Sequence, residues 1–358
     1  MSRTELQKEI LLPPFRPGPE SARRIMRTQL TVLMLPVLAA LYFQPVPVLR
    51  IILPALLTAA LTDLIIHLFR QNRYPGDTAH SLLIGLMLAL TLPVGCVWYI
   101  PAAGALMAVL LGKYLWGGSG RYIWHPALLG RVLVQLLFTE QIHMALTAGT
   151  ASPSPLYVLH NLDGLSFGNF VPQLGLYMYN HLPPLEQCLW GVLPGGLGES
   201  HRLLLILIGL YFIYRGYLHW QLPLIFIATA YVCAGFFPIP LQPDGANPEL
   251  IFPPIMAENL SVGITYMNYH LFTGGLILTA FILTSDMTSR PLTVRGQVYL
   301  ACGAGVLTML IRLYCPERLY PYIGPIPAYT AYLALTTFVP VIDRLIRPRA
   351  HRKVQTTT

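Results

Sequence analysis

The sequence predicts an all-α, polytopic membrane protein with about ten transmembrane helices. Of its 358 residues, 54% are hydrophobic and only 11% are charged, and the mean hydropathy is +0.57. Soluble proteins contain about 25% charged residues, so this chain lacks the charges that a surface in water needs. A disordered chain requires low hydrophobicity, and a disulfide scaffold requires more than five cysteines in a chain of this length. These three classes of protein are therefore excluded.

Apolar runs of transmembrane length, or slightly less, recur along the chain. A spanning helix needs about 20 mostly apolar residues. The predicted spans are Leu30–Val46, Leu49–Phe69, Ser81–Leu92, Cys96–Leu115, Trp124–Phe138, Leu203–Tyr217, Leu222–Phe237, Leu271–Thr284, Val298–Tyr314 and Pro327–Ile342. Several are short, and the third ends directly before Pro93. Such segments are typical of broken helices whose ends meet inside the protein, although a tilted or poorly delimited span gives the same pattern.

The placement of lysine and arginine predicts the orientation of the spans. Cytoplasmic loops of membrane proteins carry an excess of basic residues. Here basic residues crowd at both ends of the chain, whereas none occurs between Arg131 and Arg202 or between Arg215 and Arg290. Both termini are therefore expected in the cytoplasm. Because the net charge of +8 is distributed in this way, it does not indicate a nucleic-acid-binding face.

The same charge pattern divides the chain into three parts. Residues 1–28 are expected to form a cytoplasmic N-terminal segment, residues 29–348 the membrane domain, and residues 349–358 a cytoplasmic basic tail. The long loops at about 140–201 and 238–269 contain no lysine or arginine and are expected outside.

Two stretches of the chain have similar sequences. His80-Ser-Leu-Leu-Ile-Gly-Leu-Met-Leu and His270-Leu-Phe-Thr-Gly-Gly-Leu-Ile-Leu share their histidine, a glycine and two leucines in register. The third span is expected to start inside and the eighth outside, so the two copies would run in opposite directions. This predicts a 5+5 inverted repeat with broken helices, an architecture of transporters, although a leucine-rich alphabet also produces such matches by chance.

One carboxylate, Asp63, lies in the middle of a predicted span. A charge there costs about 2.5–3.5 kcal/mol on insertion scales and marks a functional site by default. Asp63 is therefore a candidate for ion handling. A structural pair with a neighbouring helix explains it equally well, and both interpretations stay open.

Two glycine-rich turns are candidate cofactor contacts. They are residues 111–121, which contain Gly117 and Gly118, and residues 193–201, which contain Gly198. Exposed backbone N–H groups near helix starts bind phosphates or anionic cofactor edges, although tight turns between helices also use glycine. The five cysteines form no C-x-x-C motif, and the chain shows no catalytic dyad and no cluster of metal ligands.

Eight stretches in this order resemble a known family. They are Ser21-Ala-Arg-Arg-Ile-Met, Ser81 to Pro93, Gly112-Lys-Tyr-Leu-Trp-Gly-Gly, His125-Pro-Ala-Leu-Leu-Gly-Arg, Gly195-Gly-Leu-Gly-Glu-Ser, Gly274-Gly-Leu-Ile-Leu, Thr284-Ser-Asp-Met-Thr-Ser-Arg-Pro and Pro340-Val-Ile-Asp-Arg-Leu-Ile-Arg-Pro. The chain resembles the D subunits of the Rnf electron-transport complex and the B subunits of the sodium-translocating NADH:quinone reductase. The resemblance runs from about Arg16 to Pro348.

This resemblance implies a ten-helix membrane subunit with an inverted repeat and a fold like that of urea transporters. It implies a place in the cytoplasmic (inner) membrane of a bacterium, within a complex that couples electron flow to Na⁺ or H⁺ movement. The implied partners are the other subunits of that complex, the lipid bilayer and a quinone.

The resemblance also implies flavin cofactors. Family members carry FMN, phosphoester-linked to a threonine in a Ser/Thr-Gly-Ala-Thr motif of the outside loop after span five, and the quinone-reductase relative also holds riboflavin without a covalent bond. Here the motif departs from the pattern. Thr147-Ala-Gly-Thr150 keeps both threonines, whereas Ser152-Pro-Ser154-Pro-Leu156 keeps the following Pro-Leu. Thr150 is the preferred acceptor and Ser154 the second. His125 stands where the family has asparagine, which puts inherited contacts at that turn in doubt.

The resemblance nominates the remaining cofactor contacts. They are Lys113, Gly117, Gly118, Gly198, Glu199, Ser200 and Asp286. The leading prediction is a subunit that passes electrons through a bound flavin. A one-electron step needs no general acid or base from the protein, whose part is to place the flavin and tune its potential.

Two other functions fit the residues. The first is a flavin-free structural anchor that still docks redox partners in a divergent complex. The second is a channel or transporter for a small solute, with which an inverted repeat and broken helices are compatible. Bound flavin in the purified protein separates the leading prediction from both.

Overall fold

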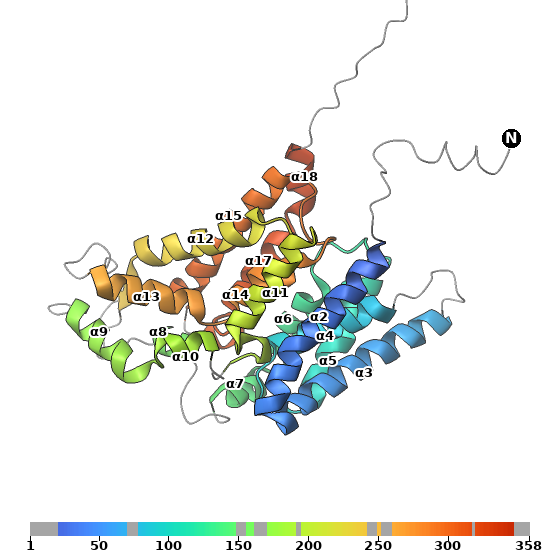
Figure 1. The fold of residues 1–358 in the computed structure, drawn as a ribbon, viewed down its shortest axis with the longest axis horizontal. Coiled ribbons are helices and arrows are strands. Elements are labelled where there is room, and N and C mark those ends of the chain that lie inside the picture. Colours follow the sequence, from blue (N-terminus) through green and yellow to red (C-terminus); the bar gives the residue numbers. More distant parts are fainter. Residues whose placement is uncertain are drawn as a thin grey trace, which may run out of the picture.

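The described part of the chain is mostly helical (Figure 1). The computed structural model describes residues 21–69, 78–147, 155–160, 170–190, 195–241, 249–251, 260–316 and 319–346. Within them the only sheet is an antiparallel ribbon of β1 (Ile239–Leu241) and β2 (Glu249–Ile251). The predicted all-α class is therefore confirmed, with this short ribbon as an addition.

The N-terminal half consists of long apolar helices. They are α2 (Ala22–Phe43), α3 (Pro45–Phe69), α4 (Thr78–Thr91), α5 (Tyr99–Met107) with its π-helical continuation η1 (Ala108–Tyr114), and α6 (Pro126–Leu137). Side chains cap two of these helices: Ser21 accepts the N–H of Arg24, and His125 accepts the N–H of Leu128. The proline that follows His125 suits the first position of a helix, where no N–H is needed.

Shorter elements connect the two halves. They are α7 (Thr139–Thr147), α8 (Pro155–His160), α9 (Phe170–His181), α10 (Leu185–Trp190) and the 3₁₀ turn η3 (Leu197–Glu199). Hydropathy alone does not reveal them, because each is short and only one side is apolar.

The C-terminal half repeats the helical pattern. It contains α11 (Arg202–Tyr214), α12 (Gln221–Phe236), α13 (Leu260–Phe272), α14 (Leu276–Phe281) with the 3₁₀ turn η5 (Leu283–Ser285), α15 (Val294–Tyr314), α16 (Tyr320–Ile323), α17 (Pro327–Thr336) and α18 (Val339–Ile346). In Figure 1 the start of α2 and the end of α18 lie toward the top, while α7 lies at the bottom.

Among the described residues, three helices, α2, α3 and α15, are long and apolar enough to cross a membrane, with 22, 25 and 21 residues. Helix α13 and the segment Leu276–Ser285 qualify as a fourth span if they are taken together, although they are bent by 58°. Five further apolar helices have 10–17 residues: α4, α5 with η1, α6, α11 and α12. Each predicted span falls on one of these helices or on α17 and α18.

The eighth predicted span starts too late. The helix begins at Leu260 rather than Leu271, so residues 260–269, which were assigned to an outside loop, are helical. Polar residues such as Ser261 and Asn268 lower the local hydropathy. They do not prevent a helix, because Tyr266 and its neighbours are buried against other parts of the protein.

One helix end and one helix break lie inside the protein. Helix α4 ends before Pro93, and there the N–H of Leu197 donates to the carbonyl of Leu92 at 2.8 Å. Helices α13 and α14 are separated at Gly274, whose φ of 65° is a left-handed conformation that suits glycine. A broken helix is thus present at the eighth predicted span, whereas the third predicted span is one short helix that ends before Pro93.

The outer surface of the helices is apolar. On α3 the exposed leucines recur at helical spacing: Leu49, Leu53, Leu57, Leu61, Leu64 and Leu68. The opposite side of α3 presents Ala55 and Ala59 to Gly85 on α4, and a Cβ on Gly85 would lie 2.9 Å from the Cβ of Ala59. Large apolar side chains outside and small residues between helices are the pattern of a protein in lipid.

Gly130 is the tightest point between α5 and α6 and gives the first prediction. A Cβ at this position would lie 2.6 Å from the carbonyl oxygen of Gly104 and 2.7 Å from the Cβ of Ala108. Gly130→Leu is expected to lower the free energy of unfolding by about 1–3 kcal/mol or more, since the helices must separate. The thermal unfolding midpoint in detergent measures this. Leu136→Ala, on the exposed side of the same helix, should change it little; equal effects of both variants would contradict the prediction.

Candidate functional site

A buried ion pair joins α3 to η1. The ammonium of Lys113 lies 3.0 Å from the Oδ1 atom of Asp63, and both side chains are at most 2% exposed. The hydroxyl of Ser81 donates to the same carboxylate oxygen at 2.6 Å and accepts from Lys113 at 2.7 Å. The hydroxyl of Tyr114 also donates to Oδ1 of Asp63. The two predicted residues Asp63 and Lys113 thus belong to one network, which we call the Asp63 cluster.

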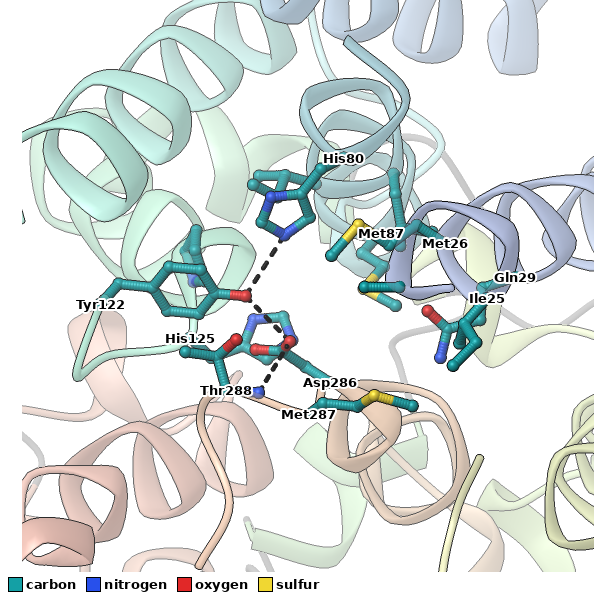
Figure 2. A pocket seen from close by; sticks show the side chains of 14 residues that line it. Ile25, Met26, Gln29, His80, Met87, Tyr122, His125, Asp286, Met287 and Thr288 are labelled. Carbon is teal, nitrogen blue, oxygen red and sulfur yellow. Dashed lines mark hydrogen bonds between the residues drawn. The ribbon is translucent and has the colours of Figure 1, made fainter. Parts of the chain in front are cut away.

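A hollow adjoins this cluster and contains Asp286 (Figure 2). The hydroxyl of Tyr122 donates to Oδ1 of Asp286 at 2.9 Å and lies 3.2 Å from the Nε2 atom of His80. The Nδ1 atom of His80 lies 2.9 Å from the hydroxyl of Ser119, and the backbone N–H of Thr288 donates to Asp286. These contacts hold the carboxylate of Asp286 in place, directly after the 3₁₀ turn η5.

The opposite wall of the hollow is mostly apolar. Figure 2 shows Ile25, Met26 and Gln29 of α2 and Met87 of α4 facing the polar group across the gap. The volume open to water-sized groups is about 30 Å³, which is room for water alone. The Oδ2 atom of Asp286 is buried and has no hydrogen-bond partner in the described part of the chain.

The glycine turn at 117–118 does not line the hollow. The N–H of Gly117 donates to the carbonyl of Tyr114 at 3.2 Å, and the N–H of Gly118 donates to that of Lys113 at 3.1 Å. Both glycines have a φ of 104°. The N–H groups that were expected to receive a cofactor close the end of η1 instead. The next residue of the turn, Ser119, bonds the ring of His80 and so positions it.

The second predicted group has a separate set of contacts. Glu199 accepts a hydrogen bond from the hydroxyl of Tyr329 at 2.8 Å. Gly198 packs against the end of α4, where a Cβ would lie 2.9 Å from the carbonyl oxygen of Leu90, and Ser200 is buried. No described contact joins Gly198, Glu199 or Ser200 to Asp286. The predicted cofactor residues therefore divide between two places in the structure.

Three buried arginines surround this second place, and the sequence analysis did not select them. Each is at most 4% exposed and donates to carbonyls at a helix end. Arg131 bonds the carbonyl of Thr91 at the end of α4, and Arg202 bonds that of Cys188 in α10.

Arg312 completes the set. Its guanidinium donates to the carbonyls of His270 and Thr273, where α13 breaks. A cation is favourable at a helix C-terminus, where carbonyls lack partners. The sequence could have indicated this arginine, because Arg312 is a charged residue near the end of the predicted span Val298–Tyr314.

The two candidate flavin acceptors, Thr150 and Ser154, lie outside the described residues. Leu156, the second residue after Ser154, is buried and packs beside Gly274. The described chain thus resumes close to the break between α13 and α14.

The apolar helices with buried charges and breaks define a multi-pass, all-helical membrane protein. A family model described as the NQR2, RnfD, RnfE family matches residues 11–352, and the chain belongs to this family.

Individual relatives cover most of the chain. The D subunit of the proton-translocating ferredoxin:NAD(+) oxidoreductase complex of Clostridium ljungdahlii is 28% identical over 310 residues, which cover 84% of this chain and 82% of that protein. The D subunit of the Na(+)-translocating ferredoxin:NAD(+) oxidoreductase complex of Acetobacterium woodii is 25% identical over 97% of this chain and 96% of its own length. The D subunit of the ion-translocating oxidoreductase complex of Stutzerimonas stutzeri is 31% identical, with coverages of 76% and 75%.

Tyr329 provides the prediction for the second place. Tyr329→Phe removes the hydroxyl that donates to Glu199 and leaves a carboxylate oxygen without this donor. The free energy of unfolding is expected to fall by about 1–3 kcal/mol, measured by thermal or denaturant unfolding. Tyr322→Phe, at an exposed tyrosine of α16, is the matched control. A loss in the control as large as that in Tyr329→Phe would refute the role given to this hydrogen bond.

Proposed function

We propose that the chain is a membrane subunit of an ion-translocating oxidoreductase complex, in which it passes electrons through a bound flavin and couples this to Na⁺ or H⁺ movement. The observation that carries the proposal is family membership over residues 11–352. It is supported by relatives that are D subunits of such complexes. The partners of this chain are then the other subunits of its complex. A quinone as a partner stays a prediction from the resemblance alone.

The proposed architecture has ten spans in a 5+5 inverted repeat, like that of urea transporters. Corresponding helices of the two halves make corresponding contacts, which supports the repeat. Helix α3 packs on α5 as α12 packs on α15, α2 packs on α4 as α11 packs on α14, and α6 packs on α5 and η1 as α17 packs on α15. The third element of the N-terminal half, α4, is short, and that of the C-terminal half is interrupted between α13 and α14. The proposed location is a bacterial inner membrane, with both termini in the cytoplasm.

The hollow at Asp286 is the proposed place for a non-covalent flavin. The pyrimidine edge of a flavin has an N–H donor beside carbonyl acceptors, and Asp286 offers a buried, unpartnered carboxylate oxygen among the described residues. His125 beside Asp286 and Gln29 on the opposite wall supply polar groups for the acceptors. The donor set therefore fits. The ring needs more room than about 30 Å³, which the flexible side chains of Met26 and Met87 would provide by turning aside.

The residues of the hollow have distinct tasks in this proposal. A bound flavin supplies the electron-carrying chemistry, and the chain supplies its position and electrostatics. Tyr122 and the N–H of Thr288 hold Asp286 in one orientation, so its free oxygen points in a fixed direction. The methionines and Ile25 exclude water from the opposite side. Because Lys113 and Asp63 are close by, the charge of this region is set by the Asp63 cluster as well.

A covalent FMN would be attached through Thr150 or, second, Ser154. Both hydroxyls lie in the segment that was expected outside, where the family's acceptor threonine falls. The departure from the family motif favours one other candidate function, a flavin-free anchor of a redox complex. One measurement decides between them.

Flavin fluorescence of the denatured protein on a gel, together with the intact mass, is that measurement. We expect a fluorescent band whose mass exceeds the chain by one FMN phosphoester, and we expect Thr150→Ala to abolish both signals. Ser154→Ala serves as the matched variant, and loss there instead would move the attachment to Ser154. A dark band that releases flavin from the native protein would remove the covalent site but keep the function. No flavin in either form would leave the anchor or the channel.

The non-covalent site has its own test. Asp286→Asn keeps an acceptor for Tyr122 but removes the negative charge, and a hydrogen bond to a charged group is worth about 1.5–3 kcal/mol. The non-covalent flavin retained by the purified complex is expected to fall by about tenfold or more. Asp343→Asn is the control, since Asp343 accepts an N–H at the start of α15 and does not line the hollow. Unchanged retention in Asp286→Asn would place the flavin elsewhere.

A further inference from the structure

A row of hydrogen bonds leads from the surface of the protein to Asp286. The hydroxyl of Ser119, an exposed residue of the glycine turn, lies 2.9 Å from the Nδ1 atom of His80. The Nε2 atom of His80 lies 3.2 Å from the hydroxyl oxygen of Tyr122, which donates to Oδ1 of Asp286 at 2.9 Å. Figure 2 shows the last two contacts meeting at the Tyr122 hydroxyl. Three side chains thus connect an exposed hydroxyl to a carboxylate in the hollow.

The donor and acceptor types give this row one direction. A carboxylate only accepts, so the hydroxyl proton of Tyr122 goes to Asp286, and the Tyr122 oxygen accepts from the Nε2–H of His80. The Nδ1 atom of the neutral imidazole then carries no proton and accepts from the hydroxyl of Ser119. Every proton of the row therefore points toward Asp286.

The middle of the row is buried and rigidly stacked. His80 and Tyr122 are each 3% exposed, and their rings lie at 19° to each other with centres 5.8 Å apart. The other charged and titratable groups that act on His80 are Lys113 on η1, Asp63 on α3, His125 before α6 and Asp286 after η5. Because a neutral imidazole accepts a proton on one nitrogen as it gives one up from the other, no additional charge has to be buried at His80.

The free oxygen of Asp286 faces the place where charge would change. Its Oδ2 atom is buried, has no hydrogen-bond partner in the described part of the chain, and belongs to the hollow. An electron added to a group bound there puts a second negative charge beside this carboxylate. Like charges in a poorly hydrated place repel strongly, which favours the protonated form of the carboxyl group.

We propose that Ser119, His80 and Tyr122 are a proton relay, which protonates Asp286 from the surface when a group bound in the hollow is reduced. The proton compensates the charge of the added electron, so the net charge of the hollow stays constant. The reduced group in this inference rests on the proposed function. The transfer of a proton to Asp286 depends on the residues of this chain alone.

The transfer balances in atoms and charge. The hydroxyl proton of Tyr122 moves to Oδ1 of Asp286, and the Nε2 proton of His80 moves to the Tyr122 oxygen. The proton of Ser119 moves to Nδ1 of His80, and water outside replaces it. One proton leaves the solvent, one O–H bond forms at Asp286, and the electron comes from the electron donor of the complex. All three hydrogen bonds persist with their directions reversed.

The first readout follows Asp286 and does not require flavin. The pH of the purified full-length protein is lowered rapidly, and the infrared carbonyl band of the protonated Asp286 is recorded in time. The band is assigned by its absence in Asp286→Asn. A positioned acid–base group accelerates proton transfer by roughly 10²–10⁴-fold, so the band should appear about 100-fold more slowly, or slower still, in His80→Gln.

The glutamine variant separates a relay from a structural role. Its side chain offers one acceptor and one donor, so it can bond both neighbours of His80, but it cannot exchange the two as an imidazole does. Tyr122→Phe interrupts the row at its centre and should slow the band by a similar factor. His219→Gln and Tyr322→Phe, at exposed residues of each type, are the matched controls and should behave like the natural protein.

Chemical rescue protects the test against a variant that only disturbs packing. In His80→Ala, added imidazole should restore the fast appearance of the band, because it supplies a ring with an acceptor and an N–H donor. The compound 1-methylimidazole fills the same space but has no N–H group, so it should not restore the rate.

The second readout uses the purified complex with its flavin. The flavin is reduced at an electrode at constant pH, its absorbance reports the reduction, and the infrared band reports Asp286. The band is expected to appear on reduction of the natural protein. In His80→Gln it should lag behind the absorbance change by about the factor found in the first readout.

Three results would overturn the proposal. If the band appears equally fast in His80→Gln, the proton enters elsewhere, and the cavity of about 310 Å³ that borders Tyr122 and Asp343 is then the candidate route. Equal rescue by both imidazoles would show that His80 only fills space. Reduction of the flavin without the band would refute charge compensation at Asp286. A complex without flavin would refute the proposed function, whereas the first readout would still decide the relay.

Discussion

The structure depends on satisfying the backbone carbonyls that broken helices expose inside a membrane. No water is present in the bilayer core to bond them, so each unmet group would cost several kcal/mol. Arg131 bonds the end of α4, and Arg312 bonds the end of α13, where Gly274 allows the turn. The buried end of α4 and the break after α13 are stable because these guanidiniums reach their carbonyls. Helix ends can then meet in the centre of the protein without lipid contact.

Charge pairing is the second constraint, and it separates two polar places. Around Glu199 the guanidiniums outnumber the carboxylate, so this place is positive and favours anions. The Asp63 cluster and the hollow instead present two carboxylates, Asp63 and Asp286. The ammonium of Lys113 neutralises Asp63, whereas a further cation is disfavoured beside Glu199. The division of polar groups fits a protein that handles ions and an electron carrier at one end and anchors broken helices at the other.

Helix α17 connects these two places. Tyr329 donates a hydrogen bond to Glu199. Tyr332, one turn further along α17, interacts electrostatically with Asp286. The tight contacts at Gly130 and Gly85 hold the surrounding helices at fixed distances, so polar side chains on different helices keep their alignment. Rigid spacing matters for electron transfer, because the protein's contribution is the position of the carrier.

The sequence by itself determined the class, the helices and several of the residues that matter. Hydropathy and charge placement are local properties, so they indicated a polytopic membrane protein, a short apolar segment that ends before Pro93, and Asp63 as a costly carboxylate. The tertiary structure alone decided the pairings. Asp63 meets Lys113 across 50 positions of the chain, Tyr122 meets Asp286 across 164, and the arginines meet helix ends that lie on other elements. Such contacts follow from how helices pack, and hydropathy does not encode that packing. For the same reason the cofactor contacts predicted from the resemblance lie in two separate places, one near Asp286 and one near Glu199.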